Sequence, residues 1–290
     1  MNILITGANG QLGSEFKELS HANKEHRFTF TDIEELDITD YLALGKFLSK
    51  NKFQCIINCA AYTAVDKAET ETEKAVAINA TAVKYLTEYA SAQNALFIHV
   101  STDYVFDGKN YKPYLENDLT NPKSIYGKSK LDGEVEVIFN AKNAIIIRTS
   151  WLYSSYGNNF VKTILKKAKE TENLNVVDDQ VGSPTYARDL AVCILKIIPA
   201  YKPANKFEIY NFANEGVASW YDFAKEIISL SGIKCNINPV ESKDYPVVAN
   251  RPPYSVFNKS KIKSAFNIII PYWKDSLRDC LVKLNEIKTR

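Results

Sequence analysis

The 290-residue sequence carries 36 Lys and Arg against 34 Asp and Glu, which leaves a formal net charge of +2. This balance gives no electrostatic signature of nucleic-acid binding, and no apolar run approaches the ~18 residues that a membrane helix requires. Residues 1–5 lead straight into glycines, without the basic and apolar regions of a signal peptide. We therefore expect a cytoplasmic protein with one large core and neither nucleic-acid nor membrane partners.

The first half of the chain alternates short apolar runs with helical patterns. This alternation predicts an α/β fold, a Rossmann-like doubly wound parallel sheet with helices on both faces and right-handed crossovers. We assign residues 1–150 to a dinucleotide-binding domain of this kind. The expected strands are residues 2–6, 27–32, 55–59, 96–100 and 144–148, and the expected helices are residues 11–19, 41–49, 75–92 and 125–139.

After Trp151 the alternation becomes irregular. We expect residues 151–290 to form mainly a smaller, discontinuous C-terminal lobe that binds substrate, with later segments returning to the first domain. Helices are predicted at residues 159–169, 186–198, 219–230 and 274–287, and a strand at residues 207–212. The five cysteines form no CxxC pair, so we expect reduced thiols and no zinc site.

A glycine loop follows the first predicted strand. Gly7, Gly10 and Gly13 stand at the point where the strand would turn into a helix, a context that brings backbone amides to a pyrophosphate. Asp32 closes the second predicted strand, where a carboxylate can accept hydrogen bonds from the adenosine ribose. The spacing differs from GxGxxG because Asn9 takes the place of the second glycine. The pattern predicts dinucleotide binding; Asp32 favours NADH, and NADPH stays open because nearby cations could accept a 2′-phosphate.

Tyr126 and Lys130 are four residues apart on a predicted helix and therefore share one face. A nearby ammonium would stabilise the phenolate and lower the tyrosine pKa toward the working range. Thr102, just past a predicted strand, would bring a hydroxyl to the same edge of the sheet. YxxxK alone is common on surface helices, but its order after the glycine loop, the acid and the strand-end hydroxyl predicts a hydride-transfer site.

Several longer motifs carry a resemblance that covers nearly the whole chain. They are residues 58–69 (NCAAYTAVDKAE), 101–106 (STDYVF), 126–131 (YGKSKL), 148–153 (RTSWLY), 157–160 (GNNF), 179–185 (DQVGSPT) and Arg251 with Pro252. With these motifs the chain resembles the extended short-chain dehydrogenase/reductase superfamily and, within it, the dTDP-4-dehydrorhamnose reductase family. The resemblance implies NADH- or NADPH-dependent reduction of the C4 ketone of dTDP-4-dehydro-β-L-rhamnose to dTDP-L-rhamnose, the last step in making this sugar for surface polysaccharide such as O-antigen.

The same resemblance implies roles for individual residues. Tyr126, Lys130 and Thr102 would be catalytic, and the first two would also touch the nicotinamide ribose. The remaining expected cofactor-binding residues are Gly7, Gly10, Gln11, Leu12, Gly13, Asp32, Asp37, Ile38, Ala61, Tyr62 and Thr63. The expected substrate-binding residues are Thr102, Asp103, Trp151, Asn159, Gln180 and Arg251, and the arginine would clamp the diphosphate.

Some alternatives remain. Some family members resemble dimers bridged by a metal such as Mg²⁺, in which a glutamate of the first helix, here Glu15, joins paired acids of the second lobe. Arg188 and Asp189 stand where those paired acids would be expected, so we predict no metal and either a monomer or a homodimer. Dehydratases of this fold carry a glutamate where Tyr104 stands, which favours reduction. A 6-deoxy-L-talose-forming reductase or epimerase, or a non-catalytic dinucleotide-binding regulatory subunit, would share much of the pattern. His99 is expected to be a core histidine without a catalytic role.

Overall fold

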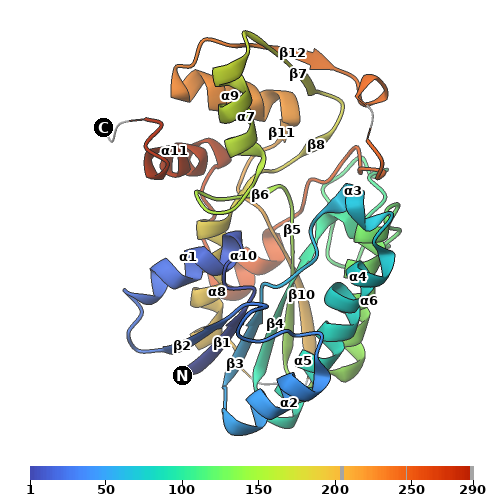
Figure 1. Cartoon of the computed structure of the whole chain (residues 1–290), viewed down its shortest axis with the longest axis vertical. Coiled ribbons are helices and arrows are strands. Elements are labelled where there is room, and N and C mark those ends of the chain that lie inside the picture. The colour runs from blue at the N-terminus through green and yellow to red at the C-terminus, as the bar shows by residue number, and fades with distance from the viewer. Residues whose placement is uncertain (203–205, 246, 288–290) are drawn as a thin grey trace.

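The computed structural model describes residues 1–202, 206–245 and 247–287. Within them, six parallel strands form one sheet in the order β10-β5-β4-β3-β1-β2 (Figure 1). Central strands such as β3 and β5 are buried along their whole length, which explains their uninterrupted apolar runs. The predicted Rossmann-like fold class is confirmed. The strands are β1 (Asn2–Thr6), β2 (Arg27–Thr31), β3 (Cys55–Asn58), β4 (Leu96–Thr102), β5 (Ala144–Thr149) and β10 (Phe207–Phe212).

Helices cover both faces of the sheet. On one face, Phe16, Ile194 and Ile262 join a single apolar cluster with the strands. On the other face, Leu86 and Val137 do the same. The first set of helices is α1 (Gln11–Ser20), α8 (Ala187–Ala200) and α10 (Ser260–Phe266), and the second is α2 (Tyr41–Lys50), α5 (Ala82–Ala92) and α6 (Ile125–Asn140).

The chain returns to the sheet late in the sequence. β10 pairs in parallel with β5, from Phe207 beside Ala144 to Phe212 beside Thr149. α8 packs against α1 on the same layer. Residues beyond 150 therefore contribute β10 and the helices α8 and α10 to the sheet layers as well as building a second lobe.

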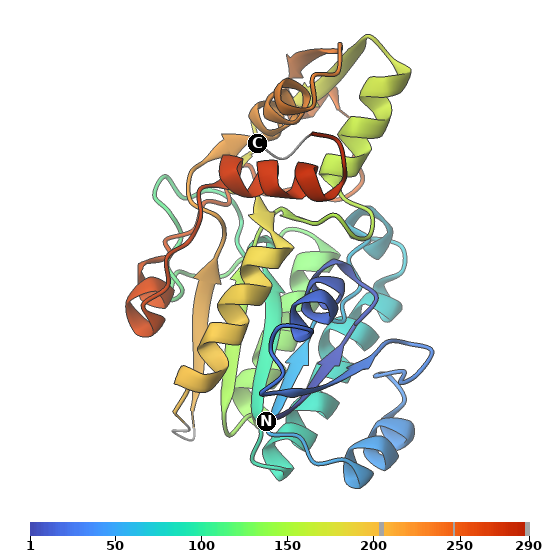
Figure 2. The ribbon, with the colours of Figure 1, turned by 90° about the vertical axis from the view of Figure 1, so that its left-hand side faces the viewer.

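The second lobe lies beyond the carboxyl ends of the strands (Figures 1 and 2). Phe223, Trp273 and Leu277 are buried at its centre. Its two-residue strands were not predicted, because so short a segment shows no periodicity. Its elements are α7 (Phe160–Glu170), α9 (Trp220–Ser231), α11 (Trp273–Lys283), and the strand pairs β6 (Leu152–Tyr153) with β9 (Thr185–Tyr186), β8 (Val181–Gly182) with β11 (Ala218–Ser219), and β7 (Asn173–Val177) with β12 (Asn236–Val240).

The helix predicted over residues 75–92 differs most from expectation. It divides into α4 (Thr72–Val76), the π-helical turn η1 (Ala77–Thr81) and α5. η1 lies against α6 so closely that a Cβ at Gly133 would come 2.1 Å from the carbonyl oxygen of Asn79. The last helix ends at Lys283, earlier than the predicted residue 287. Short helices are α3 (Val65–Ala68), η2 (Asp103–Val105) and η3 (Ser242–Asp244).

The strand order reverses at β1, which has β2 on one side and β3 on the other. In open parallel sheets ligands bind at such a reversal, outside the carboxyl ends of the strands. The glycine loop, the end of β3 and the end of β4 all lie at this edge. None of the helices in the described residues is long and apolar enough to cross a membrane.

Candidate active site

The glycine loop turns β1 into α1. Gly7 has φ +65°, and a Cβ there would lie 2.5 Å from the amide nitrogen of Ala60; a Cβ at Gly13 would lie 2.4 Å from the carbonyl oxygen of Gly7. These two glycines allow the tight turn. Gly10 precedes the helix without any side-chain cap, so the first amides of α1 face outward as donors. Gly10, Gln11 and Leu12 line a cleft of about 550 Å³ at the carboxyl edge of the sheet.

The other expected cofactor residues divide into two groups. Ala61 and Thr63 line the cleft, whereas Asp32, Asp37 and Tyr62 lie outside its lining. The Asp32 carboxylate accepts hydrogen bonds from the amides of Asn9 at 2.7 Å and Ile33 at 2.8 Å, and so holds the glycine loop. The Ile38 side chain is 7% exposed and packs in the apolar cluster with α2, so only its backbone could reach a cofactor.

α6 presents Tyr126 and Lys130 to the cleft. Ser124 caps the helix by accepting a hydrogen bond from the amide of Gly127, and Tyr126 and Lys130 follow on one face. Lys130 donates to the carbonyl oxygen of Val100 at 2.6 Å and lies 3.4 Å from Nε2 of His99. Burial lowers the pKa of Lys130 to about 8, against the upward pull of Glu134.

Tyr126 does not have the lowered pKa that the sequence predicted. Burial raises the pKa of Tyr126 to about 12; the Thr102 hydrogen bond opposes this shift and the Asp103 charge adds to it. In the described residues no hydrogen bond joins Lys130 to Tyr126, because the lysine amine is directed to Val100 and His99. The expectation that Lys130 lowers this pKa is therefore wrong for this arrangement.

Thr102 ends β4 and Asp103 begins η2, both inside the cleft. Both are buried, and the Thr102 hydroxyl donates to the Asp103 carboxylate at 3.0 Å while it accepts a hydrogen bond from the Tyr104 amide at 3.3 Å. Burial raises the pKa of Asp103 to about 6, although hydrogen bonds with Ser255 and Thr102 act downward. The Tyr104 ring meets the Tyr126 ring edge-on at 5.3 Å. Hydroxyl, carboxyl and two phenols are thus gathered at one point.

Trp151 follows β5 in a left-handed conformation with φ +48°, an uncommon backbone for a bulky residue and typical of functional sites. Its ring stacks on Trp220 with centroids 3.7 Å apart. Gly182 lies against the indole, since a Cβ there would be 2.7 Å from the ring. Trp151, expected to bind substrate, is therefore backed by a second indole, and Trp220 is a cleft residue that the sequence reasoning missed.

Asn159 and Gln11 join the two lobes at the cleft. The Asn159 amide donates to Oε1 of Gln11 at 3.0 Å and to the carbonyl oxygen of Ser154 at 2.7 Å. Its Oδ1 accepts a hydrogen bond from the Lys162 amide and caps α7. Asn159 therefore fixes the second lobe against the N-terminus of α1.

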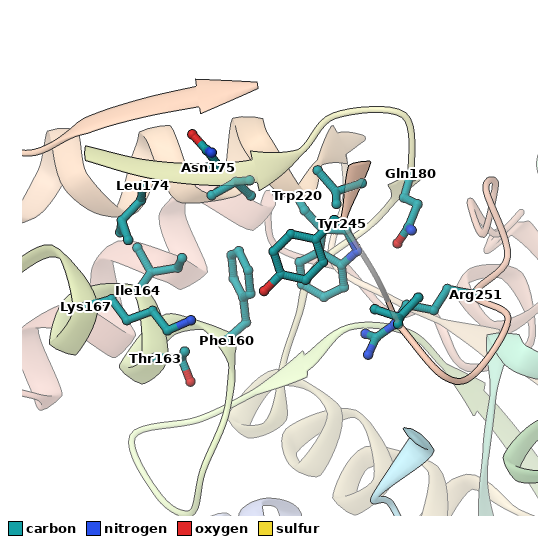
Figure 3. A pocket seen from close by; sticks show the side chains of 13 residues that line it. Phe160, Thr163, Ile164, Lys167, Leu174, Asn175, Gln180, Trp220, Tyr245 and Arg251 are labelled. Carbon is teal, nitrogen blue, oxygen red and sulfur yellow. The ribbon is translucent and has the colours of Figure 1, made fainter. Parts of the chain in front are cut away.

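A second cavity of about 450 Å³ adjoins the cleft and shares Trp220 and Arg251 with it. Figure 3 shows the aromatic rings of Phe160, Trp220 and Tyr245 between Lys167 and Arg251. Gln180 lines this cavity and not the cleft, and donates to the Ser242 hydroxyl at 2.8 Å.

Arg251 stands where the cleft and the second cavity meet. It pairs with Asp66 at 2.9 Å, and Asp66 also accepts a hydrogen bond from the amide of Ala249. The buried Nε of Arg251 has no hydrogen-bond partner among the described residues. Asp66 thus orients the Arg251 guanidinium, a role that the sequence reasoning did not assign to it.

Glu15, the residue that would begin a bridging metal site, is fully buried between the lobes. Its carboxylate accepts hydrogen bonds from Ser154 at 2.6 Å and Lys283 at 2.8 Å, and pairs with Arg188 at 3.4 Å. Asp189 turns away and accepts hydrogen bonds from Ser276 and Asn214. Two cationic side chains thus surround Glu15, and because they would repel a divalent cation, these residues do not fit a bridging metal.

The fold and the cleft together define a nicotinamide-dependent reductase of the short-chain dehydrogenase/reductase class, with an uncapped helix N-terminus, a strand-end threonine and a Tyr-Lys pair in one cleft. Residues 1–286 match the family model described as the RmlD substrate binding domain. The chain is 41% identical over 286 residues to the dTDP-4-dehydrorhamnose reductase of Aggregatibacter actinomycetemcomitans, covering 96% of this chain and 97% of that protein.

Two solved structures are similarly close. A dTDP-4-dehydrorhamnose reductase from Clostridium acetobutylicum is 42% identical with a TM-score of 0.93, covering 98% of this chain and 100% of that one. The Bacillus anthracis dTDP-4-dehydrorhamnose reductase in complex with NADP is 38% identical with a TM-score of 0.92, covering 97% and 99%. This chain belongs to the family described as the RmlD substrate binding domain, and the three relatives compared above are named dTDP-4-dehydrorhamnose reductases.

Proposed function

We propose that this protein reduces the C4 ketone of dTDP-4-dehydro-β-L-rhamnose to an alcohol, giving dTDP-L-rhamnose, with NADH or NADPH as the reductant. The observation that carries the proposal is the convergence of Thr102, Tyr126 and Trp151 in one cleft that adjoins a second, aromatic cavity at Arg251. The reacting sugar would lie in the cleft, and the nucleotide would extend into the second cavity.

The cofactor would bind across the uncapped N-terminus of α1. Gly10, Gln11 and Leu12 would offer amides to its pyrophosphate, with Ala61 and Thr63 along its length. When bound, it supplies the hydride that reduces the ketone. Asp32 already holds two backbone amides, so its charge is partly compensated, and we keep both NADH and NADPH as reductants.

Tyr126 would give its proton to the alkoxide that forms at C4, and Thr102 would hold the ketone oxygen by a hydrogen bond. Asp103 lies beside both and would bind a neighbouring sugar hydroxyl. Trp151, supported by Trp220, would cover one face of the sugar ring.

The nucleotide half would occupy the second cavity. Phe160, Trp220 and Tyr245 offer aromatic faces for a planar base (Figure 3), and Gln180 offers an amide. The unpartnered Nε of Arg251, together with the rest of its guanidinium, would bind the diphosphate between base and sugar.

Tyr104 favours this reaction over dehydration, because burial raises its pKa far above neutrality and it cannot replace a carboxylic acid. A purely regulatory role would not require the completed Thr102, Tyr126 and Lys130 set. The free thiols of all five cysteines are compatible with a cytoplasmic enzyme. We propose this location, with a nucleotide sugar as the small-molecule partner and either a monomer or a homodimer as the working form.

The test is to incubate the purified protein with dTDP-4-dehydro-L-rhamnose and either NADH or NADPH, and to identify the sugar by NMR. Stoichiometric cofactor oxidation with dTDP-L-rhamnose as product is expected. If the product were dTDP-6-deoxy-L-talose, the proposed configuration at C4 would be wrong and the talose-forming alternative would hold. Absence of cofactor oxidation, together with recovery of a stoichiometric protein partner, would support the regulatory alternative instead.

A further inference from the structure

Lys130 has an unusual buried neighbour. Its Nζ lies 3.4 Å from Nε2 of His99, and both residues are at most 2% exposed. The same Nζ donates to the carbonyl oxygen of Val100. Whether Lys130 can carry its proton in this place depends on which nitrogen of His99 is protonated.

Asn58 determines that protonation. Its Oδ1 lies 3.2 Å from the amide nitrogen of Ala60, a group that can only donate, and 2.7 Å from the Thr6 hydroxyl. The amide orientation is therefore fixed with Nδ2 toward His99, 3.2 Å from Nδ1. Since Nδ2 can only donate, Nδ1 of His99 must accept, and the neutral ring carries its proton on Nε2.

The Nε2–H group then points at Lys130. An ammonium has no lone pair to accept this hydrogen bond, whereas an uncharged amine has one. We propose that His99, held in its Nε2–H form by Asn58, is a positioning residue that stabilises the uncharged amine of Lys130, so that this lysine exchanges its proton during turnover. The inference rests on the proposed reductase function.

The surrounding charges agree with this assignment. α6 places Tyr126 and Glu134 one turn before and one turn after Lys130, and Cys59 approaches from the end of β3. Burial lowers the pKa of Lys130 despite the opposing effects of Glu134 and Cys59. Burial and the Lys130 charge hold the pKa of His99 well below its ordinary value, so the imidazole stays neutral.

The proton transfers of ketone reduction require Lys130 to lose and regain a proton beside His99. Tyr126 transfers its proton to the C4 alkoxide and becomes a phenolate. Within the described part of the chain no hydrogen bond joins Lys130 to Tyr126 directly, so the ammonium returns a proton to that phenolate through a water molecule and becomes the amine that accepts the His99 hydrogen bond. Uptake of one proton from water restores the ammonium, so each cycle consumes one hydride and one proton.

Nitrogen-15 NMR of histidine-labelled full-length protein tests the tautomer without any turnover. The chain has only three histidines, and His21→Gln and His26→Gln variants would assign the other two signals. We expect His99 as the Nε2–H tautomer, without titration to imidazolium through neutral pH. In Asn58→Asp a carboxylate would accept from Nδ1 and the tautomer should switch. An Nδ1–H tautomer in the unsubstituted protein would overturn the proposal.

The pH dependence of kcat/KM for ketone reduction tests the consequence. Reduction requires protonated Lys130, so activity should fall as pH rises past about 8. In His99→Gln the amide oxygen can accept a hydrogen bond from the Lys130 ammonium. The pH at which kcat/KM falls on the basic side of the profile, its basic limb, should therefore rise by about one unit. His21→Gln, an exposed control, should not move it. An unmoved limb in folded His99→Gln would refute the inference, whereas absent turnover in the unsubstituted protein would refute only the proposed function.

Discussion

Trp151 and Trp220 stack with their ring planes within 9° of each other, although one follows a strand of the sheet and the other begins α9 in the second lobe. Trp220 also lines the second cavity. The pair thus joins the two lobes and forms a wall shared by the proposed sugar and nucleotide positions.

Trp220→Leu should raise the KM for the nucleotide sugar about fivefold, because an aromatic stack contributes about 1 kcal/mol beyond buried area. The Kd for NADPH should change less than about twofold, since Trp220 is not among the residues proposed to hold the cofactor. Initial rates and a fluorescence titration measure the two quantities. Tyr221→Leu, a neighbour outside both cavity linings, is the matched control; an equal loss in both variants would contradict a specific role for Trp220.

Tyr126→Phe should reduce kcat by roughly a hundredfold or more while the cofactor Kd stays the same, because only the transferable proton is removed. Single-turnover kinetics with the keto sugar would isolate this step from product release. Tyr111→Phe is the control, since that phenol is 84% exposed and lies outside the cleft. Near-normal turnover in Tyr126→Phe would end its assignment as proton donor.

Much of the fold was predictable from the sequence, because a parallel sheet buried on both faces leaves continuous apolar runs. Strands β1, β3 and β5 are of this kind. The π-helical turn η1 was not predictable, since its cause is the close approach of Gly133 on a distant helix. Nor was the exact role of β10, whose pairing with β5 depends on where the chain returns after the second lobe.

The site was predictable where chemistry depends on local spacing, as for Tyr126 and Lys130. It was not predictable where long-range contacts decide, as for the Trp220 stack on Trp151. His99 shows the limit most clearly, because the sequence indicated a core histidine, which it is, and only the structure places Lys130 against its ring.

The protein should have a lower free energy of unfolding when the buried Asp103 carboxyl is ionised. Its pKa is raised to about 6 from an ordinary 3.8, so the folded state binds the proton more tightly, and stability should fall as pH rises between these two values. Asp103→Asn removes the buried charge and should add about 2 kcal/mol to the free energy of unfolding at pH 7, with little change at pH 3.5. The same variant should lower kcat/KM, because a ligand-binding group is lost.

Urea unfolding at several pH values and steady-state kinetics measure both effects of Asp103→Asn. Asp107→Asn is an informative comparison, because hydrogen bonds from the Lys109 amide and Asn121 outweigh partial burial and hold the pKa of Asp107 below its ordinary value. That variant should lose stability at pH 7. If Asp103→Asn also lost stability at pH 7, the unfavourable buried charge at this position would be ruled out.

Lys283 should stabilise the contact between the lobes through Glu15. Lys283→Met leaves the fully buried Glu15 carboxylate with Ser154 and the more distant Arg188, and should cost about 2 kcal/mol of unfolding free energy. Lys274→Met on the same helix breaks a surface pair with Glu226 and removes a cation from above the Trp273 ring, and should cost about 1 kcal/mol or less. Because cations of the chain itself satisfy Glu15, treatment with a chelator should leave the Tm unchanged. Equal effects of the two substitutions, or a Tm lowered by the chelator, would contradict this account of the cluster.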